Sequence, residues 1–396
     1  MGGAARPRTR DLGLWIGLLP PGPTNTIVDV PNVAVGHSTV RRDEPDPPAG
    51  RGVARTGVTA IVPFSPADLF RFRLPAGADV LNGAGEAIGM TAIREWGALE
   101  TPIFLTSSMA IGRVYDAAVA ILGEVDPVGT SVIMPVVAEC DDGYLNRSRP
   151  VQVSPADVRA ALDGARGPEA GPCGLGAVGA GTGMRCFELK GGIGSASRVV
   201  RPVGRWSDEP AAGAPSYTVG VLLLANFGEL GRLTIDGVRV GQALRAEGWP
   251  GVGGGAERPG PRGAEGSCIG VVATDAPLLG GALERLARRV GLGLARAGST
   301  AHHGSGEIFL AFSTGLPLPS VPPEALAART VLDDEYLDPF FGAVVEATEE
   351  AVLDALFAAE TTIGRDGHVV PALPIERTVE LLAEAGRPVH LPGAPR

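Results

Sequence analysis

The sequence is poor in several residue types, and these shortages exclude some classes of function. Among its 396 residues are 34 basic side chains, only one of them a lysine (Lys190), and 44 acidic ones, giving a net charge of −10. Binding to nucleic acid relies on clustered lysine and arginine, so we expect no nucleic-acid partner. We interpret the shortage of lysine itself as coding bias, with no mechanism attached.

Cysteine, histidine and long apolar runs are also scarce. The four cysteines form no CxxC pair, and with five histidines they give no zinc-ligand spacing, so we predict no metal and no cofactor. The longest apolar run, residues 217–227, is much shorter than the roughly 20 residues that cross a bilayer. The apolar stretch at 12–19 lacks a small-residue cleavage site. We therefore expect a cytoplasmic protein without a membrane span.

What is present is a globular composition rich in turns, with 44% hydrophobic residues, 58 glycines and 35 prolines. Short Val- and Ile-rich segments alternate with apolar positions at helical spacing, which predicts an α/β fold. Strands are expected over residues 25–40, 57–64, 102–106, 131–138, 198–203, 218–226, 233–240, 267–274 and 307–313. Helices are expected over residues 85–96, 112–122, 277–298, a long segment from 338, and 375–385.

Two motifs have a plain structural interpretation. Residues 174–179, GLGAVG, match the dinucleotide pattern GxGxxG, but no strand precedes them and no helical stripe follows. We interpret them as a glycine-rich loop packed against other backbone. His302 and His303 could supply a general base, but no acidic residue stands at metal-ligand spacing beside them, so we favour a loop that lines a cleft.

The junction at Gly266 and Ser267 indicates chemistry. Residues 245–266 contain eight glycines and three prolines, which predicts a mobile, exposed segment, and Ser267 opens the apolar run that follows. A chain that begins with serine can use its own α-amine to activate the hydroxyl. A flexible linker that ends in glycine before a rigid strand suits self-cleavage. An ordinary loop-to-strand junction has the same pattern, so the pattern alone leaves both readings open.

Several sequence blocks, in order along nearly the whole chain, resemble the self-processing N-terminal serine hydrolases of the L-aminopeptidase/D-esterase and β-peptidyl aminopeptidase (DmpA-like) family. These blocks include TNTIVDVPNVAVGHSTV, MPVVAECDDGYLN, KGGIGSASRVV, VLLLANFG, GSCIGVVATDAPLL and HGSGEIFLAFST. The resemblance implies a four-layer αββα sandwich related to the ornithine acetyltransferase type, and a single domain over residues 1–396. It also implies cleavage between Gly266 and Ser267 into an α chain (1–266) and a β chain (267–396), assembled as a homo-oligomer of αβ protomers.

By the same resemblance, Ser267 is the nucleophile, Ser305 and Glu307 are its catalytic partners, and Asn226 donates to the oxyanion. Residues 305 and 307 are two apart on an emerging strand, so their side chains point to one side. An asparagine amide can stabilise a tetrahedral oxyanion. The simpler reading of Asn226 is that it only ends a strand and caps a turn.

The resemblance offers Glu139 as the partner of the substrate's amine. Family members carry Tyr two residues further on, where this chain has Asp141. Either Asp141 adds a second anion to the amine pocket, or Tyr144 supplies the phenol. The chain also departs from the family in a longer loop at 174–183 and in His302 and His303, which replace small or amide residues.

Together these features predict an aminopeptidase or amidase that releases N-terminal residues from short peptides, amides or esters through an acyl-enzyme. One rival is an uncleaved, non-catalytic relative that binds small amines or peptides. A second is an acyltransferase using the same site, which a serine in place of the threonine of ornithine acetyltransferases disfavours. The choice among α-L, D and β-amino acid substrates stays open.

Overall fold

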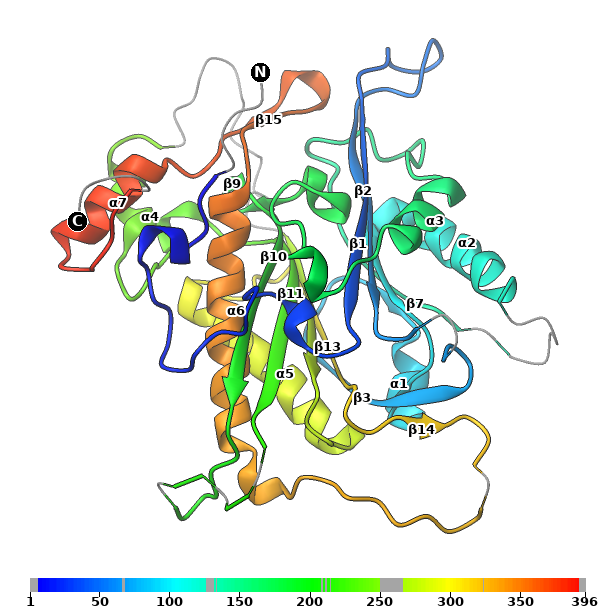
Figure 1. Ribbon diagram of the computed structural model, residues 1–396. Coiled ribbons are helices and arrows are strands. Elements are labelled where there is room, and N and C mark those ends of the chain that lie inside the picture. The colour runs from blue at the N-terminus through cyan, green and yellow to red at the C-terminus, as the bar shows by residue number, and fades with distance from the viewer. Residues whose placement is uncertain are drawn as a thin grey trace.

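The computed structural model describes residues 6–65, 68–125, 132, 134–207, 209–210, 212–213, 215–249, 266–322 and 324–391. Two β-sheets lie against each other, and helices cover the outer face of each sheet (Figure 1). The predicted α/β class and its four αββα layers are confirmed. No helix in the described ranges is long and apolar enough to cross a membrane.

The first sheet has the strand order β1-β2-β6-β7-β4. Its strands β1 and β2 form an antiparallel pair, whereas β6 and β7 run parallel. Helices α2 and α3 cover its outer face, at the right in Figure 1. The elements are β1 (Ala34–Arg42), β2 (Ala54–Val62), β4 (Ala87–Ile88), β6 (Ile103–Ser107), β7 (Val136–Cys140), α2 (Ile111–Gly123) and α3 (Pro155–Asp163).

The second sheet has the order β10-β11-β12-β13-β3-β14, with β5 also paired to β3. Strands β12 and β13 run parallel, and α5 makes the crossover that a parallel pair requires. Its strands are β3 (Phe72–Gly83), β5 (Ala98–Leu99), β10 (Gly192–Val200), β11 (Tyr217–Asn226), β12 (Ser267–Thr274), β13 (Gly306–Ser313) and β14 (Leu318–Pro319). The remaining elements are α1 (Met90–Trp96), α4 (Val240–Ala246), α5 (Gly280–Ala297), α6 (Asp338–Ala358), α7 (Ile375–Glu384), β8 (Arg185–Cys186), β9 (Leu189–Lys190), β15 (Thr362–Ile363) and β16 (Val369–Val370).

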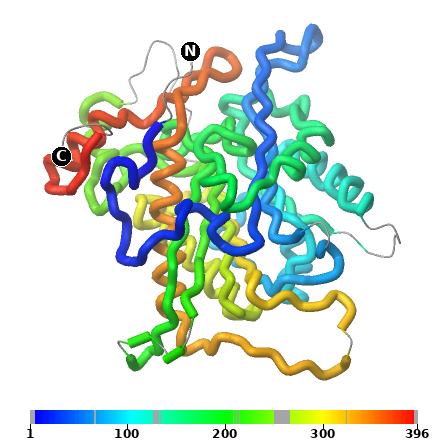
Figure 2. Tube along the Cα trace, in the orientation of Figure 1, coloured from blue at the N-terminus to red at the C-terminus, as the bar shows by residue number. Residues whose placement is uncertain are grey.

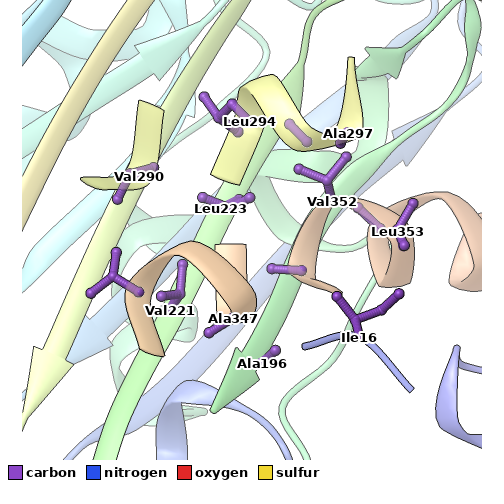
Figure 3. Packing of buried hydrophobic residues seen from close by; sticks show 14 of the residues in the cluster. Ile16, Ala196, Val221, Leu223, Val290, Leu294, Ala297, Ala347, Val352 and Leu353 are labelled. Carbon is purple, nitrogen blue, oxygen red and sulfur yellow. The ribbon is translucent and has the colours of Figure 1, made fainter. Parts of the chain in front are cut away.

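Three apolar clusters hold these layers together. One fills the space between the two sheets, a second lies under α2 and α3, and the largest packs α5 and α6 onto the second sheet. Figure 3 shows Val290 and Leu294 of α5 and Val352 of α6 meeting Val221 and Leu223 of β11. Strands β12 and β13 are therefore covered on both faces, which explains why they read as unbroken apolar runs.

The structure departs from the sequence-based prediction at several elements. The prediction of a strand over 233–240 is wrong. Asp236 (φ 47°) and Gly237 (φ 77°) form a tight turn closed by a single bridge between Ile235 and Val238. Helix α4 then starts at Val240. The predicted helix over 85–96 is shorter, because α1 begins only at Met90. Strand β3 and helix α3 were not predicted. Most of the linker predicted over 245–266 lies outside the described residues.

The segment between β14 and α6 is long and has little regular structure, and it runs along the lower edge of the molecule in Figure 2. Helix α6 begins at Asp338, where Pro339 occupies the first turn, as the sequence predicted. Helix α5 ends at Ala297, and the residue that caps it is Gly298, whose φ of 111° is open to glycine. These boundaries fix the lengths of the two helices that cover the sheet carrying Ser267.

Candidate functional site

Three strand ends of the second sheet meet at Ser267. Ser267 is the first residue of β12, opposite Asn226 at the end of antiparallel β11 and opposite Gly306 at the start of parallel β13. A central strand with partners on both sides is fixed in register. The position of the Ser267 hydroxyl is therefore set by the sheet and not by a loop.

Gly266 packs against the end of β11 more closely than any other residue type allows. A Cβ at this position would lie 2.1 Å from the carbonyl oxygen of Asn226 and 2.8 Å from Cα of Phe227. The carbonyl oxygen of Gly266 accepts a hydrogen bond of 3.2 Å from Gly306 N–H, which also lies 3.3 Å from Oγ of Ser267. One amide hydrogen thus faces both the carbonyl before Ser267 and its hydroxyl.

Ser305 and Glu307, the predicted catalytic partners, are in direct contact. The Ser305 hydroxyl donates to Oε1 of Glu307, and both side chains are buried. Burial raises the pKa of Glu307, and the hydrogen bond from Ser305 offsets this in part. Among the described residues, Oε2 of Glu307 has no hydrogen-bond partner, and the pair approaches Ser267 through Gly306 with no direct hydrogen bond between the two serines.

Asn226 is held at both ends of its side-chain amide. Its Oδ1 accepts from the main-chain N–H of Arg185 at 2.8 Å, and its Nδ2 donates to the carbonyl oxygen of Asp141 at 2.9 Å. A primary amide has two N–H groups, so the second one remains for a ligand. Since Asn226 also lines the pocket, its amide is held in a fixed orientation beside Ser267.

Glu139, at the buried end of β7, lines the same pocket. Its Oε1 accepts from the main-chain N–H of Glu86 at 2.9 Å, and its Oε2 accepts from the hydroxyl of Ser108. Burial raises the pKa of Glu139, and these two hydrogen bonds offset part of the rise. The carboxylate is thus oriented by donors from two other segments, neither of which the sequence had identified.

The pocket encloses about 170 Å³. Both alternatives for the substrate's amine are present, since Asp141 and Tyr144 line it together with Glu139 and Ser267. Arg185 completes the lining and was not expected there. Its guanidinium carbon lies 3.9 Å from the centroid of the Tyr144 ring. The His368 ring also stacks on Tyr144, with 4.5 Å between the two ring centroids.

Lys190, the single lysine, occupies a structural position that the composition of the chain did not indicate. It is completely buried, and Nζ donates to the carbonyl oxygens of Gly181 (3.0 Å), Met184 (2.8 Å) and Gly191 (2.7 Å). Burial lowers its pKa to about 7. The amine thus fixes the segment around Arg185, whose main-chain N–H donates to Asn226. Lys190 therefore supports the site indirectly.

The two other candidate features lie away from the reacting groups. His302 points its Nε2 toward Thr300 (3.2 Å) and Glu229 (3.7 Å), and neither His302 nor His303 lines the pocket. The glycine loop at 174–179 packs closely, as predicted: a Cβ on Gly179 would lie 2.4 Å from Thr59 Oγ1. Within the described ranges, no three His, Cys, Asp or Glu side chains are grouped to hold a metal ion.

The chain matches known proteins over almost its full length. The model of the family described as peptidase family S58 matches residues 25–370. The β-peptidyl aminopeptidase BapA of Sphingosinicella xenopeptidilytica is 40% identical over 386 residues, which cover 96% of this chain and 91% of the relative. BapA of Sphingosinicella microcystinivorans is 39% identical over 377 residues, 94% of this chain and 90% of the relative.

Solved structures agree with this match. The L-aminopeptidase D-Ala-esterase/amidase of Ochrobactrum anthropi, described as a prototype for the serine aminopeptidases and a variant of the Ntn hydrolase fold, superposes with a TM-score of 0.84 at 37% identity. The alignment covers 96% of this chain and 99% of that one. A Burkholderia β-aminopeptidase gives a TM-score of 0.82 at 40% identity, with the same coverage of both chains.

Proposed function

The chain belongs to peptidase family S58, and from this premise we propose that it is a self-processing serine aminopeptidase. It releases N-terminal residues from short peptides, amides or esters. The observation that carries the proposal is the common pocket that holds Ser267, Asn226 and Glu139, which are a nucleophile, an oxyanion donor and an anion for the substrate's amine. A non-catalytic binding protein would not need these three groups together.

The first step is cleavage of the chain itself. The Ser267 hydroxyl oxygen adds to the carbonyl carbon of Gly266, whose oxygen is already held by Gly306 N–H at 3.2 Å. The bond from that carbon to the nitrogen of Ser267 breaks, and the hydroxyl proton ends on the freed amine. Water then hydrolyses the ester, giving a carboxylate on Gly266 and a free α-amine on Ser267. The products are the α chain, 1–266, and the β chain, 267–396.

The freed α-amine is the general base of turnover, because its ordinary pKa lies near 8. It takes the proton of the Ser267 hydroxyl as the oxygen attacks the substrate carbonyl. Asn226 Nδ2 donates to the oxyanion, a contribution of about 2.7–4 kcal/mol for such donors. The proton passes to the leaving amine, and water then hydrolyses the acyl-enzyme. Ser305, oriented by Glu307, positions the hydroxyl of Ser267.

Two further properties belong to the same proposal. The four cysteines are all free thiols, in keeping with a reducing compartment such as the cytoplasm. The assembly of αβ protomers into a homo-oligomer rests on the family resemblance alone.

Intact mass and turnover of the purified protein test the proposal. The parent should consist of two chains divided after Gly266 and should hydrolyse a free-amine aminoacyl p-nitroanilide. Ser267→Ala should remain one chain of full length without turnover. Ser313→Ala, which removes a buried hydroxyl from β13 away from the pocket, should be processed normally. Normal processing of Ser267→Ala would overturn the assignment of the nucleophile.

A further inference from the structure

Arg185 is a cation of the pocket that the proposed reaction does not use. It lines the same cavity as Ser267 and Glu139, and its guanidinium carbon lies over the Tyr144 ring, 3.9 Å from the ring centroid. Such stacking orients the planar fork of the guanidinium while leaving its edge N–H groups free to donate. The side chain is therefore pre-organised beside the reacting groups.

The acidic residues around Arg185 are engaged elsewhere. Glu188 forms a two-pronged ion pair with Arg245, at 2.7 and 2.8 Å, and Oδ1 of Asp141 accepts from Gly143 N–H at 2.9 Å. In the part of the chain that the structure describes, no carboxylate lies within 4.0 Å of the Arg185 guanidinium, and no hydrogen bond from it is made. Burial lowers the pKa of Arg185, and Tyr144, Glu188 and Asp141 offset this only in part.

We propose that Arg185 determines specificity by binding a carboxylate of the substrate. Glu139 and Arg185 then give the pocket one site for the ammonium and one for a carboxylate, which matches a short zwitterionic substrate. A guanidinium binds a carboxylate through two parallel hydrogen bonds, a geometry that lysine cannot reproduce. The inference rests on the proposed aminopeptidase function and adds the charge of its substrate class.

The carboxylate has two possible sources, and substrate pairs separate them. The C-terminal carboxylate of a dipeptide is tested with Ala-Ala against its carboxamide. An acidic side chain on the N-terminal residue is tested with aspartyl p-nitroanilide against the alanyl compound. In at least one pair the parent should favour the anionic member in kcat/KM by about tenfold or more, the low end for hydrogen bonds to charged groups.

Variants at Arg185 show whether the preference comes from its charge and fork. Arg185→Met keeps an apolar stem against Tyr144 and leaves the main-chain N–H that holds Asn226. We expect it to abolish the preference by lowering kcat/KM for the anionic member about tenfold more than for the neutral member, and Arg185→Lys to restore only part of the preference. Arg159→Met, which removes a surface arginine paired with Glu124 outside the pocket, is the matched control and should keep the preference.

The outcomes separate this inference from the function on which it rests. Equal loss for both members of a pair in Arg185→Met would mean that Arg185 only supports Tyr144, and the inference would be wrong. A parent that hydrolyses neutral free-amine substrates but prefers no anionic member would also overturn it, with the aminopeptidase function intact. If the parent hydrolyses none of the substrates, that function fails. In that case the affinities of a reduced-bond Ala-Ala analogue and of its carboxamide, measured by calorimetry, show without turnover whether Arg185 favours the carboxylate.

Discussion

Two groups of buried carboxylates in this molecule differ in how completely they are paired. On α6, Glu350 accepts from Arg10 at 2.7 and 2.9 Å, from Arg198 at 2.6 Å and from Asn25 at 2.8 Å. Burial opposes its ionisation, but the hydrogen bonds from Arg10 and the charge of Arg198 outweigh this and lower its pKa. One turn further on, Asp354 is paired with Arg8 at 2.7 Å.

At the candidate site the carboxylates have fewer donors and no bonded cation. Glu307 accepts from Ser305, and Glu139 accepts from Ser108 and one main-chain N–H. Burial raises the pKa of both groups. No arginine lies within ion-pair distance of either among the described residues.

The difference teaches that burial of charge does not by itself mark a functional site. Glu350 and Asp354 of α6 pair with arginines of the N-terminal segment and of β10. These two carboxylates therefore find their partners within the protein. The site carboxylates have no paired cation among the described residues, and Oε2 of Glu307 accepts no hydrogen bond there. Incomplete pairing next to a pocket is therefore the better sign of chemistry, and each prediction below tests one side of this contrast.

The largest effect is expected at the paired cluster. Arg198 is fully buried and binds both Glu346 and Glu350. Arg198→Met therefore leaves Glu346 without a cation among the described residues and Glu350 with Arg10 alone. Breaking such a pair typically costs about 3–5 kcal/mol of unfolding free energy, which urea denaturation of the processed protein would measure. Arg377→Met is the control, since Arg377 pairs with Glu247, Glu380 and Glu384 at the surface, and should change stability far less. Equal losses would contradict the contrast.

A carboxyl beneath the pocket should make stability depend on pH. Asp142 is fully buried, its Oδ1 accepts from Ser107 (2.8 Å) and Asn146 (2.9 Å), and burial raises its pKa to about 6. An unfolded aspartate has a pKa near 3.9. Between about pH 4 and 6 the folded state therefore keeps a proton that the unfolded state loses. The protonated carboxyl stabilises the fold fully below about pH 4, and this stabilisation is lost as the pH rises through about 6.

Asp142→Asn removes this titration. Two pKa units correspond to about 3 kcal/mol. The unfolding free energy of the variant minus that of the parent should therefore be higher at pH 7 than at pH 4 by roughly that amount. Other carboxyls titrate alike in both proteins and cancel in the difference. The same parent-to-variant difference at both pH values would show that folding does not raise the pKa of Asp142.

The hydrogen-bonded pair of Ser305 and Glu307 should have the next largest effect. Ser305→Ala should slow hydrolysis of an aminoacyl p-nitroanilide by at least about 10²-fold, or about 2.7 kcal/mol, the low end for acid–base groups. Processing must be measured separately, because Ser267 serves both steps. Ser313→Ala on the same strand should leave kcat/KM nearly unchanged. Normal turnover in a fully processed Ser305→Ala protein would remove Ser305 from the mechanism.

The sequence predicted those parts of the molecule that depend on local pattern. Strands β12 and β13 are buried runs, and the start of α6 has its proline, so their boundaries came out within a residue or two. Helix α3 also had a local signal, the capping box of Ser154 and Asp157, which went unused. Strand β3 mixes Pro75, Gly77 and exposed positions and has no alternation, so only its pairing with β13 identifies it.

Within the candidate site, the family resemblance pointed to groups at or next to the pocket but not to the residues that hold them. Ser305 and Glu307 are two residues apart, and Gly266 and Ser267 are adjacent. The contacts of Lys190 with three carbonyls and of Arg185 with Tyr144 join segments that only the packed fold brings together. A residue whose partners are main-chain atoms leaves no pattern of residue types in the sequence.

The effect with the lowest expected minimum concerns Glu139, whose charge should select a substrate amine. A carboxylate in a cleft favours an ammonium and leaves a neutral acylated nitrogen without a partner. Truncating one member of such a buried pair costs about 2–5 kcal/mol, so Glu139→Gln should lose roughly 30-fold or more in kcat/KM for a free-amine substrate. Glu86→Gln, which changes an exposed carboxylate beside it, is the control and should keep most of the activity.

N-acetylated analogues complete this test. They should be poor substrates of the parent and little affected by Glu139→Gln, because the neutral nitrogen never used the carboxylate. If the parent hydrolyses N-acetylated and free peptides equally well, the amine has no role in binding and the exopeptidase mechanism is wrong. Asp141, which lines the same pocket, would then be the first residue to exchange.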